Sequence, residues 1–479
     1  MNNLKKIFSY IPEVKKPDEK RVDFNTKFKW TLIVLVAFFV LSNIPLFGLS
    51  ENALSRFEFL QIILAAEFGS LISLGVGPIV MASIILQLLT GSGILNIDLT
   101  KEEGKRFFQS LQKILVFFFI IFEAVVYVLM QGLQPAPGFT FLLIFQLILG
   151  GLAIFYMDEL TTKWGFGSGV SLFIAAGVSR QIFTAAFQFI DQQGRVCLLN
   201  FKTIPCTGKV LVLIQSVINR LPTELLSSGL AIISTLIVFL VVVWAQSLKV
   251  EIPLSFGRLR GYSIKWPLSF FYASVIPVIL TAALVANIQL FGSLIENVAR
   301  PCHLGLECSG PAKIASYFGF LGRFVNGQPV SGLAFWIGST NLLELFIRGG
   351  LLTRFLIQGI VHVLFFMIFS TLFAVFWVKT SGMDAKSQAH KIIASGLHVS
   401  GFRQDERILE SILDRYIMPL TVMGGLAIGF LAAITNLIGA LVSGTAVLLV
   451  IMIIFQFYQN IAQQHQMDMH PTLRKFIGS

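Results

Sequence analysis

Two ionisable side chains lie inside long apolar stretches of the sequence, where a charge is costly. Glu123 falls in the apolar run near 110–130 and His362 in the run near 356–378. A charge at the middle of a membrane helix costs about 2.5–3.5 kcal/mol on insertion scales, so such groups often bind ions, relay protons or hydrogen-bond neighbouring helices. A single acid without a charged partner supports a proton relay only weakly. For Glu123, a structural hydrogen bond and a functional role are equally well supported.

The sequence lacks the motifs of the common membrane and metal-dependent enzymes. Ser168 misses the preceding glycine of a rhomboid-type protease, because Phe166 stands in that place. There is no H-E-x-x-H zinc helix, and Gly208 precedes a lysine without the partner glycine of a phosphate-binding loop. Asp384 lies in a polar loop, which argues against a paired-aspartate intramembrane protease. We therefore expect no enzyme activity, no cofactor and no metal site.

The composition indicates that membrane helices position these side chains. Of the 479 residues, 55% are hydrophobic and only 13% are charged, and the mean hydropathy is +0.79. An ordinary soluble domain carries about 25% charged residues, and soluble cores split into separate domains beyond about 250–300 residues. Forty-six Phe and forty Gly fit a bundle in which aromatic side chains face lipid and small residues let helices approach. The sequence therefore predicts an integral membrane protein.

Apolar runs long enough to cross a bilayer occur ten times. A membrane-spanning helix needs about 20 consecutive apolar residues. The runs fall near 30–47, 71–90, 110–130, 139–157, 168–189, 229–248, 268–292, 356–378, 416–437 and 440–458. We predict an all-α polytopic membrane protein of about ten transmembrane helices in two five-helix halves. The halves are candidates for an inverted repeat, although the sequence shows no internal similarity that supports one.

Lys and Arg are concentrated in the loops on one side of the predicted spans. Residues 1–29 carry eight of them, and the apolar run that follows reads as a permanent span rather than a cleaved signal. The three short loops on the opposite side together carry one, Arg56. Because short positive loops stay in the cytosol, we expect a multi-pass protein of the cell membrane with both termini cytosolic. Topology thus explains the net charge of +11, which does not indicate nucleic-acid binding.

This topology gives a predicted organisation of the chain. It consists of a cytosolic basic segment (1–29), an N-terminal half (30–190) with an amphipathic segment at about 51–66, an external loop (191–228), a C-terminal half (229–458) with cytosolic loops at about 249–267 and 379–415 and an external loop at about 293–355, and a cytosolic tail (459–479).

All four cysteines fall in the two long external loops. Cys197 and Cys206 share one loop, and Cys302 and Cys308 share the other. Cysteines confined to an oxidising face suit two local disulfides, Cys197–Cys206 and Cys302–Cys308. A zinc site is the rival interpretation, since His303 adjoins Cys302, although the spacing is not that of a usual site. Free thiols without a role are a third interpretation.

Five short motifs occur in a consistent order along the predicted spans. They are Leu74-Gly75-Val76-Gly77-Pro78-Ile79-Val80, Gly167-Ser168-Gly169-Val170-Ser171-Leu172-Phe173-Ile174, Val250-Glu251-Ile252-Pro253-Leu254, Ile276-Pro277-Val278-Ile279 and Gly401-Phe402-Arg403. Together they resemble the SecY family in its archaeal form, the channel-forming (alpha) subunit of the protein translocon. The resemblance covers nearly the whole chain and is weakest in the long external loops. It implies a protein-conducting channel with a central hourglass pore, which moves secretory polypeptides across the membrane and releases membrane segments sideways into lipid.

The resemblance assigns a ring of aliphatic side chains to the pore constriction. An apolar constriction dewets and closes on whatever chain occupies it, so it passes polypeptides and holds back ions. In a chain this apolar, most of these positions would be apolar by composition alone. The assignment of these residues to the ring therefore rests on the matching motifs. The ring residues implied are Val76, Val80, Val170, Ile174, Ile279 and Leu431.

The segment at about 51–66 has helical spacing of apolar residues but is too short and too polar to span. On its own pattern it would be an interfacial amphipathic helix. By resemblance it is the plug, a short helix that blocks the closed pore from outside. The apolar residues of this plug-like segment are Leu54, Phe57, Leu60 and Leu64.

The resemblance also implies a lateral gate, a seam between the second and third spans on one side and the seventh and eighth on the other. Glu123 and Asn287 match the polar cluster of this seam. The third member is usually a small hydroxyl residue, but here that position is Met81. We therefore expect Ser83 or Gln87 to take its place through a modest interhelical hydrogen bond.

Ribosome docking is implied for the two longest positive cytosolic loops. Arg258, Arg260 and Arg403 lie in matching motifs and would pair with ribosomal RNA phosphates. Topology alone also demands positive cytosolic loops. The other implied partners are SecE-type and Sec-beta-type small single-span subunits, signal sequences, nascent polypeptides and the lipid bilayer. The alternative function is a secondary transporter of a small solute, with a site around Glu123.

Overall fold

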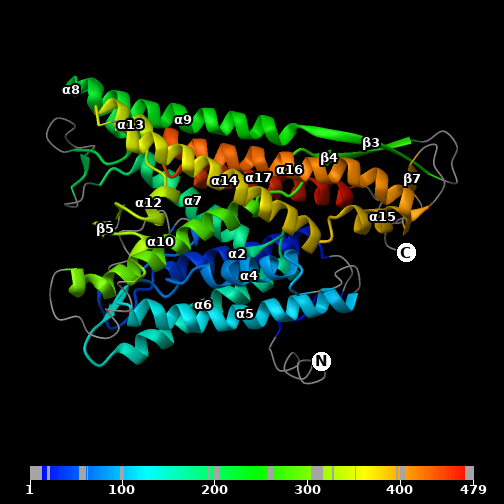
Figure 1. The fold of residues 1–479 in the computed structure, drawn as a ribbon, viewed down its shortest axis with the longest axis horizontal. Helices are drawn as coiled ribbons and strands as arrows, with labels where there is room; N and C mark the ends of the chain where they lie inside the picture. Colours follow the sequence, from blue (N-terminus) through cyan, green and yellow to red (C-terminus); the bar gives the residue numbers. More distant parts are fainter. Residues whose placement is uncertain are drawn as a thin grey trace.

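Long helices aligned along one axis make up most of the structure, a computed structural model of the chain (Figure 1). It describes residues 13–18, 22–52, 61, 63–95, 97, 102–190, 195–197, 205–256, 263–303, 317–325, 328–350, 352–394, 397–399 and 405–469. In these ranges nine helices are long and apolar enough to cross a membrane. They are α2 (Phe24–Ser42), α5 (Glu102–Leu129), α6 (Thr140–Trp164), α7 (Gly169–Phe187), α9 (Pro222–Ser247), α10 (Ile276–His303), α14 (Thr353–Thr380), α16 (Glu406–Ile438) and α17 (Gly444–Met469). The predicted all-α polytopic fold is confirmed.

The second predicted span is only partly helical. Helix α4 covers Gly77–Gly91, about 22 Å at 1.5 Å per residue, which is shorter than the roughly 30 Å hydrocarbon layer. The prediction of helix over 71–76 is wrong, because these residues form turns. Gly75 has a φ of +54°, which a helix cannot accommodate. Gly150 of α6 lies so close to this segment that an added Cβ would stand 1.7 Å from the Leu71 carbonyl oxygen.

Short elements cap the two ends of the bundle. In the described ranges the further helices with defined bounds are α8 (Lys209–Asn219), α12 (Leu333–Ile337), α13 (Leu342–Ile347), α15 (Ala385–Ala394) and the 3-10 turn η3 (Gly319–Leu321). The strands are β1 (Leu49–Asn52), β2 (Leu133–Pro135), β3 (Lys249–Phe256), β4 (Ser263–Ser269), β5 (Phe324–Val325), β6 (Gln328–Pro329) and β7 (Leu397–Val399). Strand β1 pairs with β2, so Glu51 and Asn52 are extended and the predicted amphipathic helix does not begin there.

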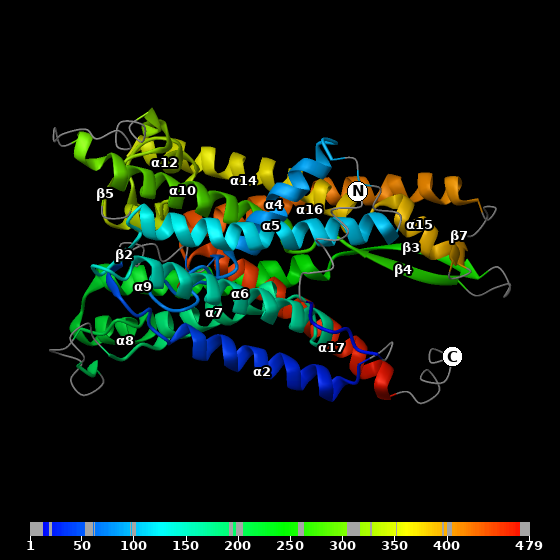
Figure 2. The same ribbon diagram turned by 90° about the horizontal axis from the view of Figure 1, so that it is seen from below.

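Strands β3, β4 and β7 lie at one end of the bundle, which we call the sheet end, and α8 and β5 lie at the other (Figures 1 and 2). The sheet order is β4-β3-β7. Strands β3 and β4 form a hairpin after α9, pairing antiparallel from Lys249↔Ser269 to Ser255↔Ser263. Strand β7 then adds to the free edge of β3, with Leu254 opposite Val399. The two longest positive loops therefore share one sheet.

Small residues let the helices of the C-terminal half approach closely. Helix α14 packs along α16. A Cβ on Gly429 would meet the Phe366 carbonyl oxygen at 2.6 Å, and one on Gly425 would meet the Thr371 Cα at 2.9 Å. The Ser370 hydroxyl donates a 3.0 Å hydrogen bond to the Gly425 carbonyl. In a bilayer, where lipid is as apolar as the helices, such close packing and interhelical hydrogen bonding hold helices together.

The two halves of the chain meet along two lines. Helix α4 packs against α10 and α14, and α17 packs against α7 and α2. Buried residues from both halves form one hydrophobic cluster through the bundle. The contact between α4 and the α10–α14 pair is the seam where the lateral gate is expected.

A short N-terminal segment, residues 13–18, is tied across α5 and α6. Lys113 of α5 donates hydrogen bonds to Glu13 at 2.6 Å and to Glu159 of α6 at 2.7 Å. Lys163 reaches the same Glu159 oxygen at 2.8 Å, and the Val14 N–H donates to its other oxygen at 3.2 Å. The hydrogen bond from Lys113 holds the pKa of Glu13 below its ordinary value. The segment thus joins the ends of two spans through a charged network.

Candidate functional site

Four of the six predicted ring residues are almost fully buried. Val76, Val80, Ile174 and Ile279 are each at most 4% exposed, and Val170 and Leu431 are partly buried against the same hydrophobic cluster. The pairs 76 and 80 and 170 and 174 are each four residues apart, which places each pair on one face of the chain. These residues come from α4, the position just before it, α7, α10 and α16, and all six lie in or against the hydrophobic cluster that runs through the bundle.

Asp158 of α6 positions the ring residue Val170. Its carboxylate Oδ1 accepts a 2.9 Å hydrogen bond from the Val170 N–H at the start of α7. A Cβ on Gly169 would stand 2.6 Å from the Asp158 Cα, so α6 and α7 touch here. In the sequence, Asp158 stands at the end of a predicted span, a position that does not by itself indicate a role. In the structure, its hydrogen bond satisfies one of the free N–H groups at the N-terminus of α7.

The end of the plug-like segment is joined directly to the ring. The Val76 N–H donates a 2.7 Å hydrogen bond to the Leu64 carbonyl, and Leu64 is fully buried. An added Cβ on Gly75 would meet the same carbonyl oxygen at 2.2 Å, so only glycine fits beside it. The other plug residues, Leu54, Phe57 and Leu60, lie outside the described part of the chain.

The polar residues predicted for the seam are buried but do not hydrogen-bond one another in the described structure. Glu123, Gln87 and Asn287 are 1%, 2% and 3% exposed. Both carboxylate oxygens of Glu123, the amide oxygens of Gln87 and Asn287, and the Tyr127 hydroxyl lack a hydrogen-bond partner among the described residues. Glu123 instead faces the start of α4, where its Oε2 would stand 3.0 Å from a Cβ on Gly77.

Ser83 does not bridge the seam. Its hydroxyl accepts a 2.8 Å hydrogen bond from Gln112 of α5, on the same side of the seam, and donates to the Ile79 carbonyl of its own helix. Apolar contacts cross the seam instead. The ring of Phe376 in α14 would stand 2.5 Å from a Cβ on Gly91 of α4.

A second apolar contact crosses between α5 and α10, where the rings of Phe122 and Phe291 lie 6.5 Å apart. Interhelical contacts of this kind leave no pattern in the sequence, because each joins residues far apart in the chain. In the described part of the chain, aromatic rings therefore contribute to the packing across the seam.

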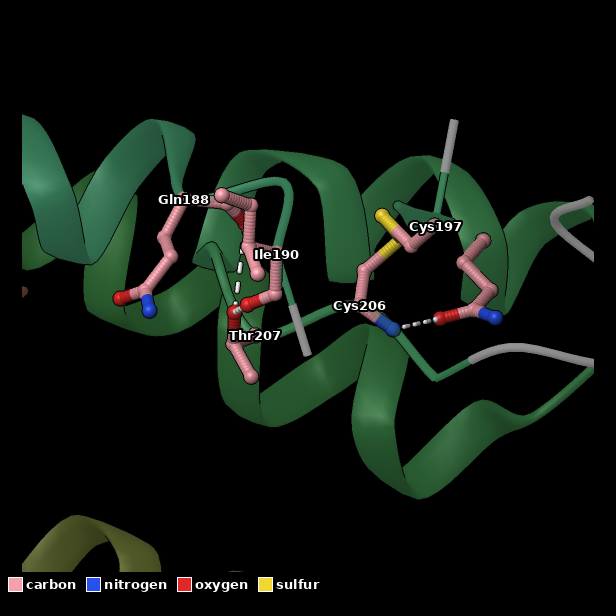
Figure 3. The surroundings of a disulfide bond; sticks show 6 residues. Gln188, Ile190, Cys197, Cys206 and Thr207 are labelled. Atoms are coloured by element: carbon pink, nitrogen blue, oxygen red, sulfur yellow. Dashed lines mark hydrogen bonds between the residues drawn. A yellow bond between two sulfur atoms is a disulfide. The ribbon is translucent and has the colours of Figure 1, made fainter. Parts of the chain in front are cut away.

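The disulfide Cys197–Cys206 lies on the connection between α7 and α8 (Figure 3). Helix α8 lies at the end of the bundle opposite the sheet (Figure 1). The Cys206 N–H donates a 2.9 Å hydrogen bond to the Gln215 side chain of α8. The Thr207 hydroxyl donates to the Ile190 carbonyl at 3.1 Å. We call this the disulfide end of the bundle. Cys302 is in the last turn of α10, and its predicted partner Cys308 lies outside the described residues.

The residues predicted to contact the ribosome all lie outside the described structure. Arg258 and Arg260 fall between β3 and β4 in the sequence, and Arg403 falls between β7 and α16. The strands that flank these two loops belong to one sheet, so both loops begin and end at the sheet end of the bundle.

Comparison with known proteins finds close relatives over the whole chain. Residues 70–458 match the family SecY, and residues 36–69 match the family described as the plug domain of Sec61p. The protein translocase subunit SecY of Methanothermobacter thermautotrophicus is 41% identical over 477 residues, which cover 98% of each chain. That of Methanocaldococcus jannaschii is 38% identical and covers both chains completely.

Solved structures give the same result. A structure described as that of a protein-conducting channel is 38% identical, with a TM-score of 0.80 and 98% of each chain covered. Sec61 in a canine ribosome–channel complex from the endoplasmic reticulum is 37% identical, with a TM-score of 0.76 and 98% of each chain covered. These relatives are channels, so a solute transporter built around Glu123 is not supported. The chain belongs to the SecY family of protein-conducting channels.

Proposed function

We propose that this channel is closed by the plug-like segment seated on the ring of Val76, Val80, Val170, Ile174, Ile279 and Leu431. The observation that carries the proposal is the hydrogen bond from the Val76 N–H to the Leu64 carbonyl, which joins the plug-like segment to a ring residue. A polypeptide entering from the sheet end would displace that segment and pass through the aliphatic ring. Flexible apolar side chains would then close around the chain and limit ion flow.

Site-specific crosslinking tests the ring. A photoreactive residue at Val80, Val170 or Ile279 should crosslink to the middle of a stalled secretory chain. The matched control is Phe183, which is on the same helix as Val170 but is 66% exposed on the outside of the bundle. Crosslinks from the three ring positions and none from Phe183 are expected. Crosslinks from the ring positions to lipid alone, while the cargo still crosses, would overturn the assignment.

The lateral gate is proposed at the seam of α4 and α5 with α10 and α14. Apolar ring contacts close it, so a hydrophobic signal helix can replace them without leaving polar groups exposed to lipid. Glu123, Asn287 and Gln87 are buried, and their side-chain oxygens lack partners among the described residues. Such unpaired buried oxygens would weaken closure. Replacing Phe376 by Ala should lower the hydrophobicity that a signal segment needs for lateral release, measured with segments of graded leucine content. An unchanged threshold would argue against the seam.

Ribosome docking is proposed at the tip of the shared sheet and the loop after β7. The canine relative is part of a ribosome–channel complex. Arg258, Arg260 and Arg403 would supply phosphate contacts there. Reversing all three to Glu should weaken ribosome binding and flatten its salt dependence. Arg407→Glu is the matched control, because it makes a single charge reversal at an exposed position on α16 next to the same loop. Equal binding by both variants would refute the docking assignment.

The assembly and topology follow from the same proposal. The sheet end faces the cytosol, both termini are cytosolic, and the disulfide end faces outside the cell membrane. SecE-type and Sec-beta-type single-span subunits would cover part of the exposed apolar surface, such as that of α2. A cysteine placed at Ser381 should react with an impermeant maleimide only after the membrane is opened. Labelling of intact cells at that site would reverse the orientation.

A further inference from the structure

A small cavity lined by both polar and apolar residues lies beside the plug-like segment. It is bordered by α2, by the end of the plug-like segment and by α7. Its polar lining side chains are Ser42, Gln61, Glu67, Arg180 and Gln181. Polar side chains in a mostly apolar bundle cost free energy unless they are paired, so their partners indicate what holds this region together.

Glu67 and Arg180 form an ion pair across this cavity. Arg180 donates from its guanidinium to the Glu67 carboxylate, although the two residues are 113 positions apart in the sequence. Each side chain is 36% exposed, so the pair is partly removed from water. Hydrogen bonds between two charged groups are shorter and about twice as strong as neutral ones. The pair therefore connects α7 with the segment that follows the plug.

Glu67 marks the point where the plug-like segment joins a firmly held loop. The Glu67 carbonyl accepts hydrogen bonds from the hydroxyls of Ser70 at 2.7 Å and Ser73 at 3.3 Å. On the other side, the Ala66 N–H donates to the Gln61 carbonyl at 2.9 Å. Residues after Glu67 are thus tied to the start of α4, and residues before it belong to the segment that must move.

Arg180 stands on the same helix as two ring residues. It follows Ile174 by six positions, which is about 9 Å farther along α7 at 1.5 Å per residue. That direction leads toward the disulfide end, where the plug-like segment must sit. The guanidinium of Arg180 therefore reaches the base of the plug-like segment from α7.

We propose that Arg180 is a positioning residue for the plug-like segment and that its ion pair with Glu67 holds the closed state. The inference rests on the proposed plug. In the closed channel the pair fixes the base of the segment to α7, next to the carbonyl of Leu64 that bonds Val76. Displacement of the segment moves Glu67 relative to α7 and breaks the pair.

The test is a charge swap measured as ion leak of the purified channel complex in planar bilayers. Arg180→Glu and Glu67→Arg each place like charges together and should raise the resting open-to-closed ratio about fivefold. The double swap, Glu67→Arg with Arg180→Glu, should return the leak to near the wild-type level. Arg323→Glu, an exposed arginine in the 293–355 loop, is the matched control and should leave the leak unchanged.

Further variants separate folding from positioning and the pair from the plug. Arg180→Gln removes the charge without repulsion, and a smaller rise in leak at unchanged melting temperature supports the proposal. A double swap that leaks as much as either single variant would overturn it. A channel lacking residues 53–60 reports on the plug alone. If that deletion raises the leak and the charge variants do not, the pair is refuted and the plug stands; if the deletion has no effect, the plug assignment fails as well.

Discussion

Replacing Gly75 by Ala should unseat the plug-like segment without touching the ring side chains. Gly75 has a φ of +54°, and an added Cβ would lie 2.2 Å from the Leu64 carbonyl oxygen and 2.8 Å from the Ala66 Cβ. No rotation of a methyl group relieves a contact with backbone atoms. The Leu64 carbonyl must therefore move away from the Val76 N–H, and their 2.7 Å hydrogen bond is lost.

The expected change in gating follows from separating two costs. Left-handed backbone in a non-glycine residue costs about 1–2 kcal/mol, but this strain is present in every state that keeps the loop conformation. Only the contacts with Leu64 and Ala66 of the plug-like segment differ between the seated and the displaced plug. A lost hydrogen bond of about 0.5–1.5 kcal/mol corresponds to an open-to-closed ratio raised by about two- to twelvefold.

Ion leak of the reconstituted channel in planar bilayers measures this ratio. Gly138→Ala is the matched control, because Gly138 has a φ of +86° and an added Cβ meets nothing within 4 Å. The Gly138→Ala variant therefore introduces the left-handed backbone strain without a steric clash. Equal ion leak from the two variants would show that the contact with Leu64 has no part in closure. It would refute the proposal that the hydrogen bond between Val76 and Leu64 holds the plug-like segment in place.

Three other perturbations test different parts of the molecule. Changing Cys197 and Cys206 to Ser should lower the unfolding free energy by about 2–3 kcal/mol, seen as a lower melting temperature in detergent that a reductant lowers no further. Glu13 has a pKa below its ordinary value because of its hydrogen bond from Lys113. The stability that ionised Glu13 gives to the attachment of residues 13–18 is therefore complete above the ordinary pKa of a glutamate and is lost as the pH falls through the lowered pKa. Amide hydrogen exchange of residues 13–18 should become faster as the pH falls through that lowered pKa. Glu123→Leu removes buried oxygens that lack partners among the described residues. It should stabilise the closed seam by about 1–3 kcal/mol, so that signal segments need more leucines for insertion, whereas an unchanged requirement would separate Glu123 from the gate.

Local patterns in the sequence predicted the membrane-spanning helices and the family. Each apolar run is long and continuous, so its helix follows from the need to satisfy backbone groups in lipid. The exception is residues 71–76, whose apolar run suggests a helix. There the left-handed Gly75 and the close approach of Gly150 decide the conformation, and both depend on neighbours far away in the chain.

Tertiary pairings could not be predicted from local patterns in the sequence, because each one depends on residues far apart in the chain. Strand β7 has three residues and acquires its conformation by pairing with β3, more than 100 positions earlier. Ser83 meets Gln112 on its own side of the seam, and nothing in its neighbourhood distinguishes that partner from one across it. The ring, plug and gate residues came from resemblance, and their roles remain predictions for the experiments above.

The shared sheet has a mechanical consequence. Strand β3 directly follows α9, β4 leads toward α10, and β7 lies between α15 and α16. A load on the sheet is therefore delivered to the ends of helices that all belong to the C-terminal half. The strands described in the N-terminal half, β1 and β2, pair with each other in a separate sheet and do not join this one. A large molecule bound at the sheet end would therefore apply force to the C-terminal half as one unit. Part of that force would act at the seam, where α10 and α14 contact α4.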